Sequence, residues 1–160
     1  MLRRIDGLLA TLILVALAIG AVSLRREPER LSGAVRVVDG DTVELDGRRL
    51  RLAGLDAPEL AQTCERGGQV YRCGEVARDA LRSLASAELD CRIAGHDRYR
   101  RDLATCEAGG RDVGRVLVLR GLAVAYGRYE AEEREAKQRS VGLWSGTFDR
   151  PSEWRQAHSR

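Results

Sequence analysis

Apolar and polar residues alternate in three neighbouring stretches of the sequence, and this pattern predicts strands. The alternation covers residues 34–38 and 42–45, with the period expected when one face of a strand is buried. Asp46 and Gly47 come next, and this dipeptide is typical of a two-residue hairpin turn. A third stretch rich in apolar residues covers 48–55. We therefore expect three consecutive antiparallel strands.

The period of the hydrophobic pattern then changes. Apolar residues recur at helical spacing over residues 74–87, which predicts an amphipathic helix. Two more apolar stretches, at 89–94 and 103–108, predict strands that are joined by a charged loop. The expected order up to this point is three strands, one helix and two strands.

Two further helices are expected after these strands. Asp112 is a suitable N-cap for a helix that reaches about Arg120 and ends at Gly121. Acidic and basic residues alternate over 130–140 and predict a solvated helix. The sequence thus predicts an α+β fold that is mainly β, a five-stranded OB-type barrel with two to three helices. Such barrels usually bind oligomers, but the fold alone does not identify an enzyme.

An uncharged apolar segment precedes the predicted barrel. As a helix, residues 7–24 would span about 27 Å, close to the roughly 30 Å hydrocarbon core of a bilayer. We interpret the segment as an uncleaved signal-anchor; a cleavable signal peptide and a buried core helix are the alternatives. We expect residues 1–31 to be anchor and tether and 32–160 to form one domain. That domain would be membrane-anchored outside the cytoplasm (periplasmic or extracellular), or secreted after cleavage.

The four cysteines fit an exported domain that uses disulfides. They are Cys64, Cys73, Cys91 and Cys106. Of the three possible connectivities we prefer Cys64–Cys73 and Cys91–Cys106, the second because both residues fall on strands that should be adjacent. Zinc is disfavoured, because the sequence has no CxxC pair and only two histidines.

Net charge is a weak guide to partners in this protein. The whole chain has a formal charge of +3, and the segment 1–31 contributes most of it. A nearly neutral domain must therefore bind phosphate through local arginines or a bound cation. All but one of the 27 basic residues are arginine, which suits bidentate contacts with phosphate or carboxylate.

Two short acidic motifs lie at the ends of predicted strands. Asp39-Gly40-Asp41-Thr42 lies between the first and second strands, and Asp56-Ala57-Pro58-Glu59 ends the third. Each motif alone is also compatible with ordinary turn chemistry. An EF-hand is excluded, because counting from Asp39 places Glu44 where that loop requires glycine. Any calcium site must therefore be assembled from separate strands.

From about Val35 to Trp144 the sequence resembles the staphylococcal nuclease (thermonuclease) family. The resemblance rests on several motifs in the same order, which together are highly specific. They are Val-Val-Asp-Gly-Asp-Thr at 37–42, Arg-Leu-Ala-Gly-Leu-Asp-Ala-Pro-Glu at 51–59, Asp-Arg-Tyr-Arg-Arg at 97–101, Gly-Leu-Ala at 121–123 and Gly-Leu-Trp at 142–144.

The resemblance implies a calcium site and a general base. Asp41 and Asp56 would be carboxylate ligands of Ca²⁺, and the carbonyl of Ala57 would add a third protein oxygen. Hard oxygen ligands of this kind suit calcium. Glu59 would be the general base or would position the attacking water.

The resemblance also implies residues that contact the substrate. Arg51 and Arg101 would bind the scissile phosphate from two sides and stabilise the charge that develops on it. Tyr99 and Tyr126 are candidates for supporting a nucleotide, with packing roles as the alternative. One departure concerns Arg100, which stands where the family usually has glycine and puts the shape of the Arg101 loop in question.

The function implied is that of a calcium-dependent endonuclease that acts on DNA and RNA with low sequence specificity. The alternatives are a non-catalytic OB-fold module that binds nucleic acid at the membrane and, less favoured, a tethered structural protein. We expect a monomer that has no protein partner and contacts the membrane through its N-terminal helix.

Overall fold

The computed structural model describes residues 28–86 and 88–158. The expected signal-anchor lies outside these residues, so the anchor and the domain boundary after residue 31 stay predictions. Within the described residues, no helix is both long enough and apolar enough to cross a bilayer.

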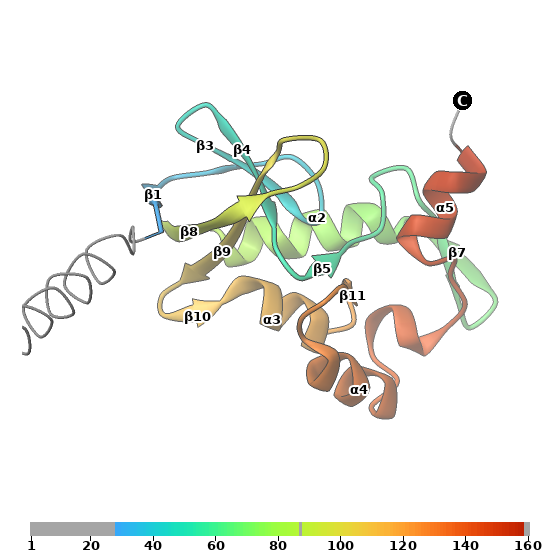
Figure 1. Cartoon of the computed structure of the whole chain (residues 1–160). Helices are drawn as coiled ribbons and strands as arrows, with labels where there is room; N and C mark the ends of the chain where they lie inside the picture. Colours follow the sequence, from blue (N-terminus) through green and yellow to red (C-terminus); the bar gives the residue numbers. More distant parts are fainter. Residues whose placement is uncertain (1–27, 87, 159–160) are drawn as a thin grey trace, which may run out of the picture.

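One curled sheet forms the centre of the fold (Figure 1). Its strands are β1 Arg30–Gly33, β2 Arg36–Val37, β3 Thr42–Leu45, β4 Arg48–Leu52, β8 Leu89–His96, β9 Asp102–Ala108 and β10 Arg111–Asp112. The order is β1-β8-β9-β4-β3-β2, and β10 pairs with β9. β4 and β9 are parallel, whereas the other pairs are antiparallel. The two edge strands β1 and β2 are consecutive in the chain, as expected for a sheet that curls toward a barrel.

The predicted hairpin at Asp46 and Gly47 is confirmed. Both residues have positive φ, 52° and 76°, as a type I′ turn requires. The turn places Leu45 opposite Arg48, and three residues further along the ladder it places Thr42 opposite Arg51. The register set by this turn therefore brings Arg51 beside the acidic loop that precedes β3.

Two strand predictions need correction. The stretch predicted as one strand over 48–55 is divided, because Gly54 turns the chain with a φ of 85°. After this turn, β5 (Leu55–Asp56) leaves the sheet and pairs with β11 (Val124–Ala125). The strand predicted over 34–38 is shorter than expected, since β2 covers only Arg36–Val37, and an additional strand, β1, precedes it and pairs with β8 from Arg30 onward. Leu31 packs partly buried against the core, which anchors β1 to the sheet.

Four α-helices lie within the described residues, one more than the upper estimate from the sequence. They are α2 Cys73–Leu84, α3 Val113–Leu119, α4 Glu130–Gln138 and α5 Pro151–His158, with a 3-10 helix η1 at Gly142–Ser145. The predicted cap of α3 is confirmed, since Asp112 accepts a hydrogen bond from the backbone of Arg115 at 3.0 Å. Helix α5 was not predicted, because its sequence is mostly polar and has no apolar periodicity.

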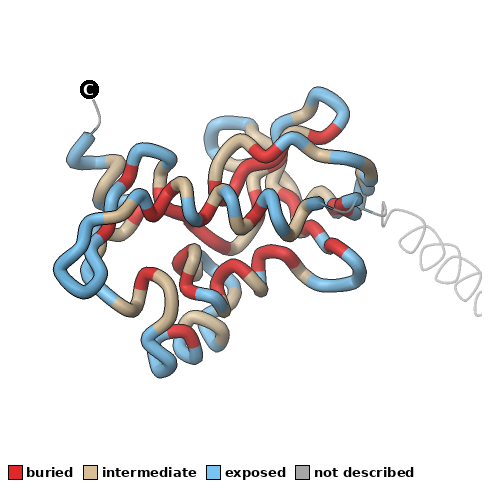
Figure 2. The backbone as a smooth tube through the Cα atoms, turned by 180° about the vertical axis from the view of Figure 1, so that it is seen from behind, coloured by how far each residue is buried: buried red, intermediate tan, exposed pale blue. Residues whose placement is uncertain are grey.

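The hydrophobic core lies between the sheet, α2 and α3. Figure 2 shows the buried positions concentrated where these elements meet. The largest side chains that are fully buried in this core belong mainly to leucine and valine: Leu45, Leu50, Leu81, Leu89, Leu117, Val43 and Val118. Burying each such side chain contributes about 1.5–3 kcal/mol. This core fixes β3 and β4, and with them the positions of the acidic loop and Arg51.

Both preferred disulfides are present. Cys91 and Cys106 are direct partners across β8 and β9, with Cα atoms 4.0 Å apart. Cys64 and Cys73, with Cα atoms 5.7 Å apart, join the start of β6 (Cys64–Arg66) to the start of α2. The segment between them was expected to be a loop, but β6 and β7 (Gln69–Tyr71) form a hairpin there.

Candidate active site

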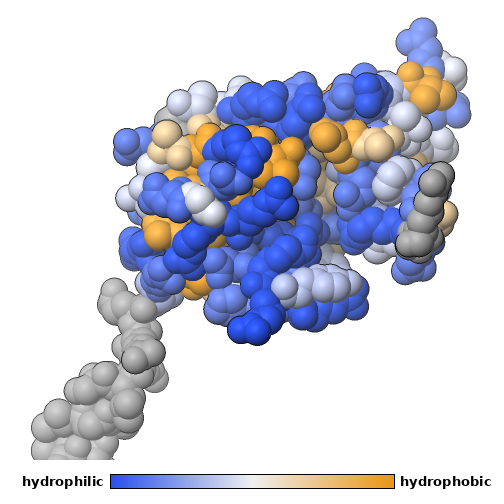
Figure 3. Space-filling model, turned by 90° about the horizontal axis from the view of Figure 1, so that it is seen from above, coloured by the Kyte–Doolittle hydropathy of each residue, from blue (hydrophilic) through white to orange (hydrophobic). Residues whose placement is uncertain are grey.

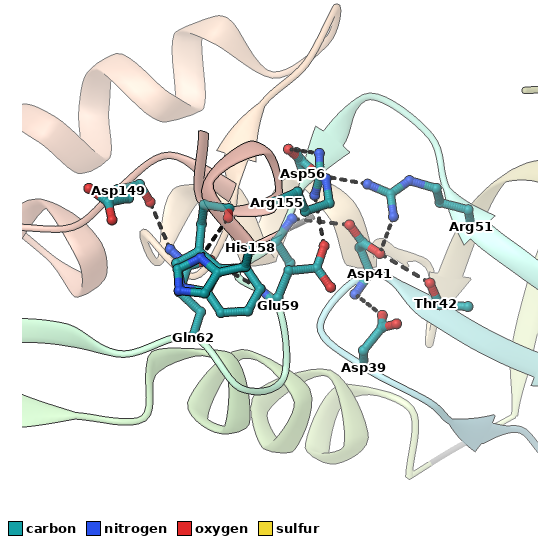
Figure 4. Close-up of polar contacts among 12 residues, drawn as sticks. Asp39, Asp41, Thr42, Arg51, Asp56, Glu59, Gln62, Asp149, Arg155 and His158 are labelled. Atoms are coloured by element: carbon teal, nitrogen blue, oxygen red, sulfur yellow. Dashed lines mark hydrogen bonds and ion pairs between the residues drawn. The ribbon is translucent and has the colours of Figure 1, made fainter. Parts of the chain in front are cut away.

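Arg51 joins the two acidic motifs. Its Nη1 donates to Asp41 Oδ1 and its Nη2 donates to Asp56 Oδ1, each at 2.7 Å. Asp41 lies in the loop before β3 and Asp56 at the end of β5, so the three side chains come from three different segments (Figure 4). One guanidinium therefore holds two carboxylates close enough together to share a single cation.

Asp41 is a buried carboxylate. Only 3% of it is exposed, and it accepts hydrogen bonds from the backbone N–H of Ala57 and the hydroxyl of Thr42, both at 3.1 Å. Burial raises the pKa of Asp41 to about 7 even though Arg51 opposes this effect. A further positive charge close to Asp41 would therefore favour its ionised form.

Gly40 allows the acidic loop to approach its neighbours. A Cβ atom at Gly40 would lie 2.7 Å from the Cβ of Ala57 and 2.9 Å from the Cβ of Ala77 on α2. A side chain at this position would therefore push Asp41 away from Ala57. The small residues at these three positions bring the two acidic motifs together.

Glu59 is held by the loop that follows Pro58. Its backbone N–H donates to the side-chain carbonyl of Gln62 at 3.2 Å. The amide of Gln62 in turn donates to the backbone carbonyl of Asp149 at 2.7 Å, and Gln62 is completely buried. Gly74 leaves room for this loop, because a Cβ there would lie 1.8 Å from the carbonyl oxygen of Glu59.

A third arginine enters the site from α5. Nη1 of Arg155 donates to Asp56 Oδ1 at 3.0 Å and to Glu59 Oε1 at 2.9 Å, and Nη2 donates to Asp56 Oδ2 at 2.9 Å. The sequence alone did not indicate that Arg155 belongs to the site. Pro151, followed by Glu153, is a recognisable signal for the start of a helix, but nothing in the sequence connects that helix to residues nearly a hundred positions earlier.

Arg101 is presented by a tight loop between β8 and β9. Asp97 accepts from the backbone N–H of Arg101 at 2.9 Å and from its Nε at 2.7 Å. Arg100 adopts a φ of 63°, so the loop has the left-handed conformation at the position where the family usually has glycine. Arg101 thus faces the same cavity as Arg51, but its charge is paired with Asp97 and not with Asp41 or Asp56.

The expected site residues line one cavity of about 770 Å³. Arg51, Asp56, Glu59, Tyr99, Arg101 and Tyr126 all line it, together with Arg155. Asp41 and Ala57 lie behind this wall, buried at 3% and 4% exposure. Tyr99 and Tyr126 are 64% and 76% exposed, so their rings are accessible to a ligand. The molecular face seen from above in Figure 3 is largely hydrophilic, with hydrophobic areas between the hydrophilic ones.

The oxygen atoms of this site fit a calcium ion with few protein ligands. Two buried carboxylates, Asp41 and Asp56, already share one cation, Arg51, and hard oxygen donors suit calcium. No cluster of three or more histidine, cysteine or acidic side chains with metal-binding geometry occurs within 28–86 and 88–158. The carbonyl of Ala57, water and substrate would therefore have to complete the coordination.

Comparisons with known proteins show which family this sequence resembles. A family model described as "Staphylococcal nuclease homologue" matches residues 49–146. The chain is 40% identical over 152 residues to the succinoglycan biosynthesis protein ExoI of Rhizobium meliloti, which covers 89% of this chain and 75% of that protein. It is 33% identical over 146 residues to a micrococcal nuclease of Shigella flexneri, with 77% and 79% coverage. An uncharacterized endonuclease of Haemophilus influenzae is 28% identical over 163 residues, with 93% and 84% coverage.

These matches support an endonuclease, and the matched segment includes Arg51, Asp56, Glu59 and Arg101. The family model and the relatives above 30% identity, together with the shared motifs, establish that the chain belongs to the staphylococcal nuclease family.

Proposed function

We propose that this protein is a calcium-dependent endonuclease that hydrolyses phosphodiester bonds of DNA and RNA with little sequence preference and acts outside the cytoplasm. The observation that supports this most directly is the shared contact of Asp41 and Asp56 with Arg51, at the wall of a cavity that also contains Glu59 and Arg101. The two disulfides support an exported domain. The N-terminal segment would act as the membrane anchor, or as a signal peptide if it is cleaved.

In this proposal Asp41, Asp56 and the carbonyl of Ala57 hold Ca²⁺. The chemistry that a bound ion would supply is Lewis-acid stabilisation of the negative charge that develops on the phosphate. Arg51 and Arg101 bind the phosphate through their guanidinium groups, which match its oxygens in pairs. Asp97 contacts Nε and Nη2 of Arg101, so Arg101 would bind the phosphate through Nη1 while Asp97 keeps the guanidinium oriented.

Glu59 accepts the proton of the attacking water or orients that water. Its position supports this role, because it lines the cavity on a loop whose backbone is fixed by Gln62. Tyr99 and Tyr126 offer exposed rings at the cavity wall, on which a base could stack.

The test compares nuclease activity of the oxidised full-length protein on single-stranded DNA and RNA, with calcium or with chelator. Glu59→Ala should lower kcat by roughly 10²- to 10⁴-fold, the usual contribution of a general base. Glu65→Gln, an exposed acidic residue six positions later on β6, is the matched control and should keep its activity.

Equal inactivity of wild type and Glu59→Ala in calcium would contradict the enzyme proposal. If both proteins nevertheless retained nucleic acid in a gel shift, the protein would be the non-catalytic binding module. Activity that survives the chelator unchanged would remove calcium from the proposal.

A further inference from the structure

Helix α5 is fixed against the rest of the domain. Backbone hydrogen bonds of 2.9 and 3.0 Å join Thr147 to Glu65 of β6, and Gln62 contacts the carbonyl of Asp149. Pro151, the first residue of α5, is buried. The helix lies beyond residue 146, where the family match ends, so it is a part of the site that the family motifs do not describe.

Arg155 of α5 covers the carboxylate of Asp56. Both oxygens of Asp56 accept hydrogen bonds from Arg155, and Oδ1 also accepts one from Arg51. The same guanidinium reaches Glu59 (Figure 4). The side chain of Asp56 is 7% exposed and that of Arg155 is 41% exposed, so Arg155 extends from the cavity side onto a carboxylate that is otherwise enclosed by protein.

The charges explain why an arginine is needed at this position. Among the residues that the structure describes, the three carboxylates of Asp41, Asp56 and Glu59 form ion pairs with two guanidinium groups, those of Arg51 and Arg155. Without Arg155, Asp56 would keep only Arg51, which it shares with Asp41, and Glu59 would lose this ion pair. The loss of one of the two arginines that pair with the buried carboxylate of Asp56 should therefore destabilise the folded protein.

A metal ion bound by Asp56 would meet Arg155 at the same oxygens. Arg51 and Arg155 together use three of the four lone pairs of the Asp56 carboxylate, and two of these three hydrogen bonds come from Arg155. A cation at Asp56 would therefore compete with Arg155 for these oxygens, and two positive groups a few ångströms apart also repel each other. We propose that Arg155 is the resident counter-ion of the metal-free site and competes with Ca²⁺ for Asp56. This inference rests on the calcium site of the proposed function, and it couples metal binding to the release of Arg155 from Asp56.

The test measures calcium affinity of the full-length protein by isothermal titration calorimetry. Arg155→Gln should bind calcium on the order of tenfold more tightly than wild type, because a competing cation is removed. In chelator, the same variant should unfold at a lower temperature than wild type, whereas in saturating calcium the difference should shrink. Arg150→Gln is the control: Arg150 lies on the same segment but forms its ion pair with Glu133, and it should behave as wild type in both measurements.

Unchanged or weaker calcium binding by Arg155→Gln would overturn the inference. If that variant fails to fold, Arg155→Lys replaces it, because lysine keeps the charge but cannot donate to both oxygens from a planar fork. Arg155→Lys should bind calcium more tightly than wild type, and an affinity equal to wild type would overturn the inference. Calcium binding by Arg155→Gln alone supports competition, and no binding by either protein contradicts it. Tighter binding without nuclease activity would leave the inference standing and reject the proposed function.

Discussion

Asp97 accepts hydrogen bonds from both the backbone and the side chain of Arg101, at 2.9 Å and 2.7 Å. The same carboxylate accepts from the backbone of Tyr99 at 2.8 Å, and these contacts bend residues 97–101 into a closed loop. Although burial acts in the opposite direction, the hydrogen bonds from Arg101 and Tyr99 lower the pKa of Asp97 below its usual value. The orientation of one proposed catalytic arginine therefore depends on a residue that has no chemical role of its own.

Asp97→Asn should lower kcat on DNA by roughly tenfold, the scale of a misplaced catalytic group. Asparagine keeps one acceptor but loses the charge that orients the guanidinium. Steady-state kinetics measure this effect, and Asp90→Asn is the control, because Asp90 is exposed and pairs with Arg30 on β1. An unchanged kcat would show that the guanidinium of Arg101 adopts its active orientation without Asp97.

Arg100→Gly should stabilise the protein by up to about 1 kcal/mol. A non-glycine residue in the left-handed region costs roughly 1–2 kcal/mol, and the greater freedom of glycine in the unfolded chain offsets part of this gain. Arg98→Gly in the same exposed loop has no positive φ to relieve and should lose stability. Urea unfolding of the two variants compares them directly, and a loss in both would mean that the loop is not strained at Arg100.

Gln62→Ala should reduce the free energy of unfolding by about 1–3 kcal/mol, because the backbone N–H of Glu59 and the carbonyl of Asp149 lose their partner. Nuclease activity should fall as well, since Glu59 and α5 are held through this side chain. Gln69→Ala, at an exposed position on β7, controls for the loss of a glutamine. If activity fell equally in the control variant, the bridging role of Gln62 would be rejected.

Glu133 links α4 to β11, and its ionisation should matter at low pH. Burial raises the pKa of Glu133, but hydrogen bonds from Lys137 and from the backbone of Ala125 outweigh burial and lower the net value below 4.5. A pKa that is lower in the folded state means stability that is present above about pH 4.5 and is lost as the pH falls through the folded pKa.

The variant Glu133→Gln should therefore lose stability at pH 7 and show a shallower decline of stability between about pH 5 and 3. Unfolding free energies measured across this range provide the test, and Glu135→Gln, which forms an exposed pair with Arg139, is the control. Parallel pH profiles for wild type and Glu133→Gln would contradict the prediction.

Local signals in the sequence were sufficient to predict much of the fold. Asp46 and Gly47 predicted the hairpin because their turn type needs two residues that tolerate positive φ, and the alternation around Cys91 and Cys106 predicted adjacent strands. The family motifs likewise predicted Asp41, Arg51, Asp56 and Glu59 as site residues, and the structure brings these four side chains together. These features depend on neighbouring residues or on short patterns, which a single sequence displays directly.

Contacts between distant segments were decided by the tertiary structure alone. Arg155 meets Asp56 across a sequence separation of 99 residues, and Gln62 meets Asp149 across 87. No periodicity or motif in the sequence predicts either contact, because each depends on how β6 and the segment after η1 pack together. The sequence by itself therefore determined which acidic and basic residues could form a phosphodiesterase site. Only the packing of the chain brought Arg155 to Asp56 and Glu59 and paired Arg101 with Asp97.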